Sequence, residues 1–311
     1  MNTAIDLHQI QSDIITGAKL ANVEYSESVI GQILDIFGDK FSQQVIDLKT
    51  TTKTRKKRGF YFRYLEENSH GFAWERAKTS KILVNQNRAV DRLVPEIYDT
   101  LSLLADGVDF EVNYGLTKIW QFPKTSLSVE AALKISSLPK SVHLYTEFFN
   151  KYHLDIIHLF AADYQNNSMN LYFTIVHPDY KTPQLYRNLL SELNFEIPSY
   201  EVLEILTQTG SMAFTFNWTS CAIERLCCYI GGFNRKNTPK NIDPLVTTFV
   251  QNCPSLVTDP DFILGWSFGS KESSGTYLKM EIDYSGNVVS FFYKLLKDSH
   301  TTNQQSNLIS V

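Results

Sequence analysis

Apolar and polar residues alternate along five pairs of short segments in this chain of 311 residues. Alternation of this kind is typical of β-strands that pack one face against a core, and two such strands joined by a turn form a hairpin. The pattern predicts hairpins over residues 41–66, 107–122, 154–175, 210–231 and 261–285.

The segments between the hairpins carry apolar residues at helical spacing instead. They predict helices over residues 4–21, 26–38, 88–105, 127–150, 181–194, 199–207, 241–251 and 287–297. A helix–strand–strand–helix unit thus recurs roughly every 50–60 residues, which indicates a repeated supersecondary structure. No Gly/Ser-rich linker interrupts the series, so we expect one domain over residues 1–311, with a frayed polar tail from about residue 299.

The expected strands are polar on one face and apolar on the other. In residues 168–174, for example, Ser168, Asn170 and Tyr172 point to one side and the apolar side chains to the other. A polar strand face usually meets water, but here helices follow every hairpin and have to cover one face of the sheet. If they cover the apolar face, the polar faces converge. We therefore expect an α+β fold, with ten antiparallel strands closed into a barrel around a polar lumen and a ring of α-helices outside.

Cations from four different hairpins are expected to share this lumen: Arg63, Lys118, Arg225 and Lys279. Enclosed together they would repel one another and lose hydration unless an anion joined them. A diphosphate, with several negative charges and many acceptor oxygens, fits such a group of cations. The alternative is that each cation reaches out from a strand end and pairs with solvent or with Glu281 or Asp283.

Composition narrows the function further. The formal net charge of −4 argues against a nucleic-acid binder. No apolar stretch is long enough to cross a membrane, and the N-terminus lacks the pattern of a signal peptide. We expect a cytoplasmic protein whose four cysteines are free thiols. The sequence has no Asp-rich magnesium cluster, no glycine-rich phosphate loop and no zinc motif, so we predict no metal site.

With these features the chain resembles the soluble αββα-barrel (ABBA) aromatic prenyltransferases of the CloQ/NphB group. The resemblance lies in SMNLYF (168–173), FNWTSCAIERLCCYI (216–230), LTKIWQF (116–122) and TYLKMEID (276–283), and it extends over most of the chain. It implies a barrel of five αββα units. It also implies a monomeric enzyme of secondary metabolism, such as alkaloid biosynthesis, that moves an isoprenoid from its diphosphate to an aromatic small molecule.

The resemblance also assigns roles to individual positions. Those that match the diphosphate-binding residues of the family are Lys118, Asn170, Arg225 and Lys279, with Ser168 as a lesser contact. Those that match residues beside the prenyl chain or facing the acceptor are Trp120, Tyr172, His158, Ser211, Tyr229 and Asp283.

The chain departs from the family pattern in three respects, one of which is that Glu281 and Asp283 replace less acidic residues on the last strand. Where some members carry a magnesium-binding aspartate, this chain has Tyr61, and Arg63 follows two residues later. We therefore predict that no magnesium is required and that Arg63 takes the place of the metal, while Tyr61 adds to the aromatic pocket. Ala213 replaces a tyrosine that other members place near the diphosphate.

The expected reaction is an electrophilic aromatic substitution. Cations would stabilise the departing diphosphate, aromatic ring faces would stabilise the allylic cation, and a base would remove the ring proton. Glu281, Asp283 and His158 are the candidate bases, and we prefer Glu281. The two acids are equally suited to binding an N–H or O–H group of the acceptor or to balancing Lys279.

The sequence predicts only the chemical classes of the isoprenoid donor and of the aromatic acceptor. The donor is expected to be dimethylallyl or geranyl diphosphate, and the acceptor an indole, a phenol or dihydroxynaphthalene, or a phenazine. A non-catalytic barrel that binds a hydrophobic anionic ligand is the alternative function, whereas single-stranded nucleic-acid binding conflicts with the net charge. The basic run at residues 53–58 is expected to be a solvated turn, or else to attract anionic substrate at the barrel mouth.

Overall fold

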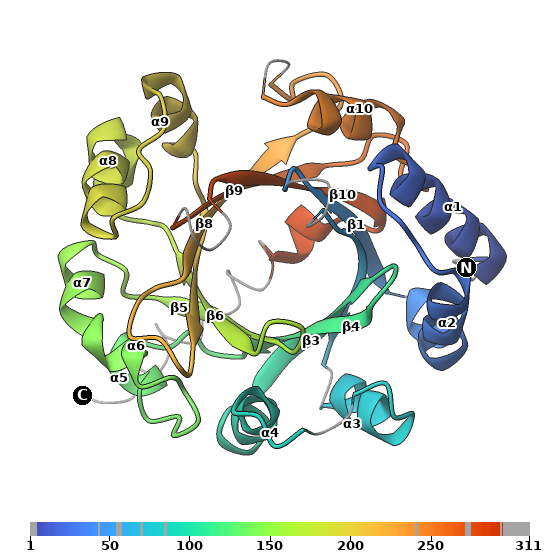
Figure 1. Ribbon diagram of the computed structural model, residues 1–311, viewed down its shortest axis with the longest axis horizontal. Helices are drawn as coiled ribbons and strands as arrows, with labels where there is room; N and C mark the ends of the chain where they lie inside the picture. The colour runs from blue at the N-terminus through green and yellow to red at the C-terminus, as the bar shows by residue number, and fades with distance from the viewer. Residues whose placement is uncertain are drawn as a thin grey trace.

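Ten antiparallel strands pair in chain order and close into a barrel, because the first strand also pairs with the last. The computed structural model describes residues 5–42, 44–53, 58–68, 71–83, 86–239, 242–270, 275–292 and 294. The barrel forms the centre of the molecule (Figure 1). Its strands are β1 Val45–Thr51, β2 Phe60–Glu67, β3 Leu103–Glu111, β4 Gly115–Pro123, β5 Ile157–Asp163, β6 Ser168–Thr174, β7 Ser211–Asn217, β8 Arg225–Phe233, β9 Phe262–Gly269 and β10 Tyr277–Ser285.

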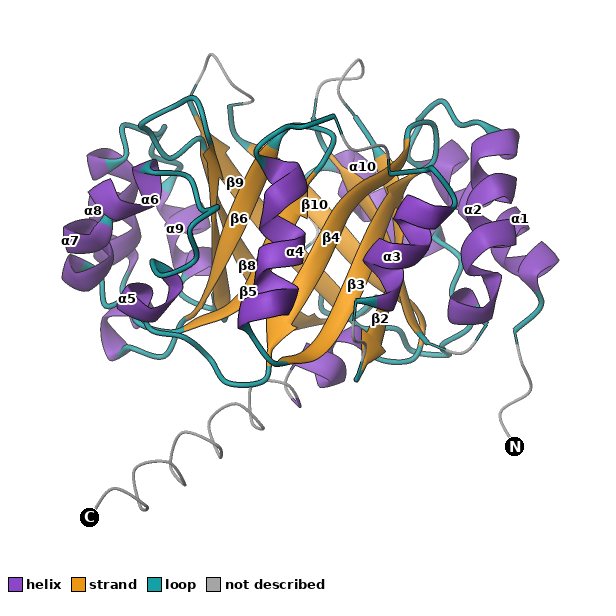
Figure 2. Cartoon of the chain, turned by 90° about the horizontal axis from the view of Figure 1, so that it is seen from below, coloured by secondary structure: helices purple, strands orange, loops and turns teal. Residues whose placement is uncertain are grey.

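Helices surround the barrel on its outer side (Figures 1 and 2). They are α1 Leu7–Leu20, α2 Glu27–Phe41, α3 Phe72–Thr79, α4 Val90–Thr100, α5 Val129–Ala132, α6 Ser141–Leu144, α7 Thr146–Lys151, the 3₁₀ helix η2 Pro178–Lys181, α8 Pro183–Glu192, α9 Tyr200–Leu206 and α10 Pro244–Asn252. They bury the apolar strand faces: on α2, for example, Phe37 and Phe41 pack against Tyr64 and Phe110. The predicted barrel with outer helices is confirmed.

Some predicted helices were wrong in extent. The segment 127–150 forms three short helices instead of one, and Pro139, which cannot continue a helix, stands between the first two. The helix predicted over 88–105 ends at Thr100, because the apolar residues that follow belong to β3. Helix α3 was missed, since it is short and its only buried residues are Ala73 and Ala77. The predicted polar tail from about residue 299 lies outside the described residues.

The register of the strands builds a ladder of charged side chains across the lumen. Asp47 on β1 pairs with Arg63 on β2, and Arg63 pairs with Asp109 on β3. Asp109 then pairs with Lys118 on β4, and Lys118 with Asp163 on β5. The polar faces predicted to converge do so here, with acidic and basic side chains in alternation across five neighbouring strands.

The chain after β10 covers one end of the barrel. Residues 288–292 form a helical turn that lies across this end in both ribbon views (Figures 1 and 2). Val288 and Phe291 are buried in one cluster with Trp120 and Phe122 of β4. The Val288 N–H group donates a hydrogen bond of 2.9 Å to Asp283 Oδ1. This end of the lumen is therefore lined by apolar side chains.

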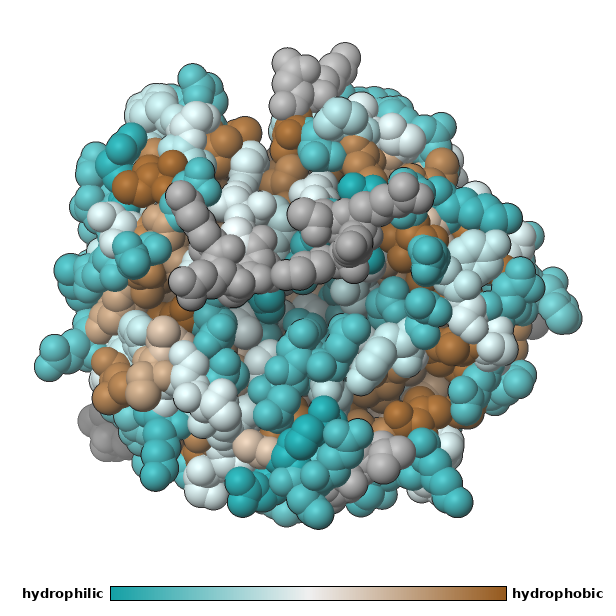
Figure 3. All heavy atoms as spheres, in the orientation of Figure 1, coloured by the Kyte–Doolittle hydropathy of each residue, from teal (hydrophilic) through white to brown (hydrophobic). Residues whose placement is uncertain are grey.

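The surface and the cysteines agree with the sequence predictions. The face seen in Figure 3 is mainly hydrophilic, with smaller hydrophobic areas between. All four cysteines are free, and the neighbours Cys227 and Cys228 lie in the inner and outer clusters of the barrel wall, as expected for adjacent strand residues. None of the described helices combines the length and apolar character that a membrane crossing needs.

Candidate active site

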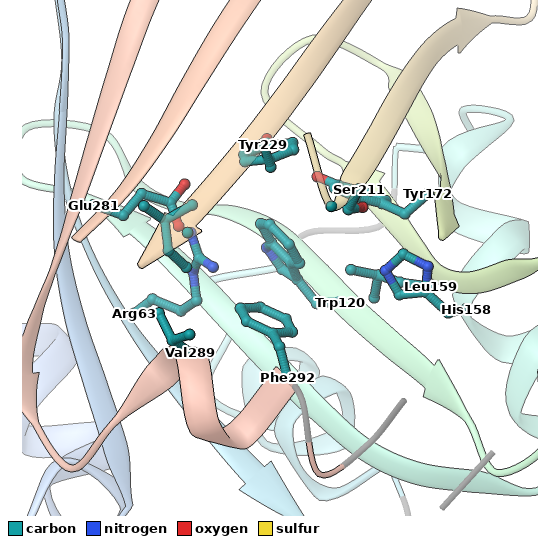
Figure 4. Close-up of a pocket in the computed structure, with 13 residues that line it drawn as sticks. Arg63, Trp120, His158, Leu159, Tyr172, Ser211, Tyr229, Glu281, Val289 and Phe292 are labelled. Atoms are coloured by element: carbon teal, nitrogen blue, oxygen red, sulfur yellow. The ribbon is translucent and has the colours of Figure 1, made fainter. Parts of the chain in front are cut away.

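A cavity of about 130 Å³ occupies the end of the lumen next to the C-terminal turn. Six or more strands contribute to it, and Figure 4 shows the lining side chains pointing toward a common space. The lining residues are Arg63, Trp120, His158, Leu159, Tyr172, Gly210, Ser211, Tyr229, Gly231, Ile263, Glu281, Val289 and Phe292. Seven of the predicted site residues are therefore brought together in one cavity.

Aromatic rings form a continuous wall on one side of this cavity. The ring centre of Tyr172 lies 5.3 Å from that of Trp120, 5.9 Å from Tyr229 and 6.3 Å from His158. Ring faces carry negative electrostatic potential, so such a wall attracts a cation and excludes water. Trp120 and Tyr172, predicted beside a prenyl chain, and Tyr229, predicted to face the acceptor, all belong to this wall.

Arg63 is bound by three carboxylates. Its Nε donates to Asp109 Oδ1 at 2.5 Å, Nη1 lies 3.3 Å from Asp47 Oδ2, and Nη2 donates to Glu281 Oε2 at 3.1 Å. The side chain is only 1% exposed, and its guanidinium carbon lies 4.0 Å from the centre of the Trp120 ring. Lys49 Nζ adds a second cation, 2.6 Å from Asp109 Oδ2. The predicted substitute for magnesium is thus already surrounded by acids.

The two aspartates that contact Arg63, Asp109 and Asp47, differ in their protonation. Burial raises the pKa of Asp109, but Arg63 and Lys49 outweigh burial and lower it to about 2. Burial raises the pKa of Asp47 to about 8, with help from Glu281 and against the attraction of Arg63. At pH 7 Asp47 is therefore mainly protonated, whereas Asp109 is ionised beside Arg63 and Lys49.

A second group of cations lies on the inner face of the same barrel. Lys118 Nζ contacts Asp163 Oδ2 at 3.0 Å, and Lys279 Nζ donates to the Tyr229 hydroxyl at 3.1 Å. Arg225 Nε is buried without a hydrogen-bond partner in the described part of the chain. Lys118, Arg225 and Lys279 all lower the pKa of Lys53, after burial itself, so the four positive charges act on one another.

Neutral polar groups extend this cationic group. Asn170 Nδ2 donates to Thr215 Oγ1 at 3.2 Å, while Asn170 Oδ1 is buried without a partner among the described residues. Ser168 is buried on β6 beside Asp163 of β5. Polar groups and cations in this number suit an anion with many oxygens, as the sequence predicted.

Two cations, Lys49 and Lys53, were not assigned to the lumen from the sequence. Lys49 shares the inner face of β1 with Asp47 and Thr51, and that alternation is the signal that could have revealed it. Lys53 was read as part of a solvated turn, yet it is half-buried with Nζ 4.7 Å from the centre of the Tyr277 ring. The middle of that basic run, residues 54–57, lies outside the described residues.

The remaining predicted residues have distinct surroundings. Tyr61 does not line the cavity, and its ring lies 4.8 Å below Lys49 Nζ. Asp283 also stays outside the cavity lining and accepts from the backbone of the C-terminal turn. His158 lines the cavity and hydrogen-bonds through Nδ1 to Thr174 Oγ1 at 3.0 Å; burial lowers its pKa to about 3. Glu281 lines the cavity, and its buried Oε1 has no hydrogen-bond partner among the described residues.

Comparisons with known proteins agree over almost the whole chain. Residues 5–294 match the family model described as "Aromatic prenyltransferase Orf2". The furaquinocin biosynthesis prenyltransferase of Streptomyces sp. (strain KO-3988) is 25% identical over 296 residues, which cover 93% of this chain and 94% of that protein. The 5,10-dihydrophenazine-1-carboxylate 9-dimethylallyltransferase of Streptomyces anulatus is 23% identical, covering 82% and 86%. The flaviolin linalyltransferase of Streptomyces virginiae is 24% identical, covering 85% and 88%.

Proposed function

Because the chain belongs to the Orf2 family of aromatic prenyltransferases, we propose that it transfers a dimethylallyl or geranyl group from its diphosphate to a carbon of an electron-rich aromatic ring. The observation that carries this proposal is the layout of the lumen. The cations Lys118, Arg225 and Lys279 lie next to an aromatic cavity whose lining includes the side chain of Glu281. The hydrogen bond from Lys279 to the Tyr229 hydroxyl connects this group of cations with the cavity. We further propose that the enzyme works as a cytoplasmic monomer in secondary metabolism.

The cations hold the donor. Lys118, Arg225 and Lys279 bind the diphosphate, with hydrogen bonds from Asn170 and Ser168. As the allylic C–O bond breaks, its electron pair moves to the diphosphate oxygen, where the positive charges stabilise the developing anion. These cations and Lys53 supply the positive charge that magnesium provides elsewhere, so the proposal includes a reaction that proceeds without added metal.

Arg63 takes a different role in this proposal from the one the sequence predicted. Its nitrogens are engaged by Asp47, Asp109 and Glu281, so binding a diphosphate would require it to leave three carboxylates. We assign it instead to the wall of the acceptor cavity. There it fixes the orientation of Glu281 through Oε2 and covers one face of Trp120.

The aromatic wall protects the reactive intermediate. The ring faces of Tyr172 and Tyr229, together with Trp120, stabilise the allylic cation and keep water from capturing it. The acceptor lies against this wall, where proximity replaces a bimolecular encounter. Its ring carbon attacks the allylic carbon and forms the new C–C bond.

Glu281 is the best placed base for the final step. Glu281 lines the cavity, and its Oε1 has no hydrogen-bond partner among the described residues and would accept the ring proton, while Oε2 is held by Arg63. Asp283 does not line the cavity, and His158 is a weak base because burial lowers its pKa to about 3. Ser211 Oγ is a second buried polar atom without a partner in the described structure. A dihydroxylated aromatic acceptor would satisfy both Glu281 and Ser211, and we favour this class over indoles and phenazines.

The test is a product assay with purified protein. Dimethylallyl or geranyl diphosphate is incubated with dihydroxynaphthalenes, phenols, indoles and phenazines, in EDTA or in magnesium, and products are detected by mass spectrometry. We expect a gain of one prenyl unit that survives EDTA. Product only with magnesium would refute the metal-independent part, and no product despite diphosphate binding would favour the ligand-binding barrel.

A pair of variants tests the base. Glu281→Gln keeps the size of the side chain and its contact with Arg63 but cannot take up the proton, so we expect at least a hundredfold lower kcat, on the order of a lost general base. Glu111→Gln is the matched control, because Glu111 is also a buried glutamate but lies outside the cavity lining and accepts from the backbone N–H groups of Asn113 and Tyr114. Equal activity of the two variants would exclude Glu281 as the base.

A further inference from the structure

Tyr277 lies on the inner face of β10 among the cations of the proposed diphosphate site. Its side chain is only 5% exposed. Lys53 Nζ lies 4.7 Å and Lys279 Nζ 6.0 Å from the centre of its ring. The sequence pattern placed it on a polar strand face but assigned it no role.

Small side chains leave room for this ring. Tyr277 pairs with Ser267 on the neighbouring strand β9. In the same row across the sheet, Ser267 pairs with Cys227 of β8, and Cys227 pairs with Ala213 of β7. The polar and charged groups that act on Tyr277 or neighbour it from the surrounding elements are Tyr61 of β2, Arg225 and Cys227 of β8, Ser267 of β9, Lys279 of β10 and Lys53 after β1. Three of them are cations. Asp163 also attracts Arg225, but it is bonded to Lys118.

The charges around Tyr277 change its acidity. Burial alone would raise the pKa of Tyr277, but Arg225, Lys279 and Lys53 outweigh burial and lower it to about 7. Two other tyrosines of the lumen, Tyr61 and Tyr172, have pKa values that burial raises. Tyr277 in turn is the strongest influence that raises the pKa of Arg225 against burial.

We propose that Tyr277 is the built-in counter-ion of the diphosphate site. While the site is empty, its phenolate oxygen neutralises the cations; when a diphosphate binds, that oxygen takes up one proton from solvent. The neutral hydroxyl then donates a hydrogen bond to a diphosphate oxygen. The inference rests on the proposed function, because it presumes that Arg225, Lys279 and Lys53 hold a diphosphate.

The physical reason is charge balance. Cations enclosed in a barrel are costly unless an anion accompanies them, and a single phenolate reduces that cost in the free protein. A diphosphate brings several negative charges to the same place, so a neighbouring phenolate becomes unfavourable and its pKa rises. Binding of diphosphate is therefore linked to the uptake of a proton.

The experiment uses inorganic pyrophosphate and isothermal titration calorimetry in buffers of different ionisation enthalpy, with wild type and Tyr277→Phe compared at pH 6 and pH 8. A phenol with a pKa of about 7 is roughly 90% ionised at pH 8 and roughly 10% at pH 6. We expect wild type to take up about 0.9 proton more than the variant at pH 8 and about 0.1 more at pH 6. The ratio of the wild-type Kd to the variant Kd should rise about tenfold between these pH values.

A spectroscopic readout tests the same proton directly. Ionised tyrosine absorbs at longer wavelength than neutral tyrosine, so pyrophosphate should remove this band from wild type at pH 8. Tyr64→Phe is the matched control: it also removes a buried tyrosine, but one whose ring packs against Phe37 and Phe110 on the outer face of β2, so we expect it to leave the proton uptake unchanged. The wild-type titration needs no variant and decides the question even where Tyr277→Phe fails to fold.

The outcomes separate this inference from the proposed function. Pyrophosphate that binds wild type and Tyr277→Phe with the same proton uptake, and without loss of the tyrosinate band, would overturn the role of Tyr277 and leave the diphosphate site intact. If wild type and Tyr277→Phe both take up protons, in the same number, this result would also point to Lys53 as the group that changes protonation. Failure of pyrophosphate to bind wild type at all would refute the proposed diphosphate site itself.

Discussion

Replacing Asp47 by asparagine is expected to stabilise the protein at neutral pH, although it removes a carboxyl group next to an arginine. Burial favours the neutral form of Asp47, so the folded protein holds a proton on this side chain at pH 7 although Arg63 lies close to it. Asparagine has almost the same shape as protonated aspartic acid and does not have to acquire that proton on folding.

The magnitude follows from the pKa of Asp47. It is raised from 3.8 to about 8, mainly by burial. Between these values the folded protein binds more protons than the unfolded chain, so wild-type stability falls as the pH rises through this window. Holding the proton costs about 1.4 kcal/mol for each pH unit above the ordinary pKa, which gives an upper bound of about 4 kcal/mol at pH 7. We expect Asp47→Asn to gain about 2–4 kcal/mol at pH 7 and close to nothing at pH 4.

Urea unfolding at a series of pH values measures this gain. Asp163→Asn is the matched control, because Asp163 is also a buried lumen aspartate but has a lowered pKa: Lys118 and Asn166 outweigh burial. The ionised carboxylate of Asp163 stabilises the folded protein at pH values above the ordinary pKa of aspartate, and this stabilisation is lost only at lower pH. We therefore expect Asp163→Asn to destabilise the protein at pH 7. Destabilisation by Asp47→Asn at pH 7, or a gain that does not change with pH, would show that ionised Asp47 balances Arg63 and would refute the reasoning.

Further variants test the cavity and its support. Arg63→Met leaves the carboxylates around it without their main counter-ion, so we expect the free energy of unfolding, measured in urea at pH 7, to fall by about 3–5 kcal/mol. A decrease below about 1 kcal/mol would contradict this expectation. Gly265→Ala places a methyl group 3.2 Å from a ring carbon of Tyr229 and should raise the KM for the diphosphate several-fold. Gly31→Ala is the control and should leave this KM unchanged, because its methyl group would lie 4.0 Å from the side chain of Gln11. Phe292→Ala enlarges the cavity and should raise kcat/KM for bulkier acceptors relative to small ones, as measured in competition assays.

Much of the barrel could be predicted from the sequence because strands and hairpins are determined by residues that lie close together in the chain. Strands such as β6, β7 and β10 alternate between apolar and polar residues, and each hairpin joins strands that are neighbours in the chain. The inward position of Lys118, Arg225 and Lys279 follows from that alternation alone. Helix α3 escaped prediction for the opposite reason, since so few apolar residues mark it.

The partners of the charged residues could not be predicted in the same way. Arg63 bonds to acids on β1, β3 and β10, and which acids these are depends on strand register and on closure of the barrel. Its predicted role at the diphosphate assumed a cation without acids around it. The protonation of Asp47 and Tyr277 depends on several neighbours at once, so no spacing of residues reveals it.

The pairing of β1 with β10 has a consequence for the synthesis of the protein on the ribosome. Glu281 and Lys279 lie on the final strand, so a nascent chain that ends before β10 contains neither the complete cation group nor the carboxylate of the cavity. Contacts between strands so far apart in the sequence also form slowly, because a long loop must close first. Binding of substrate and catalysis therefore await completion of the barrel, and a shortened chain would leave two strand edges open to association with other chains.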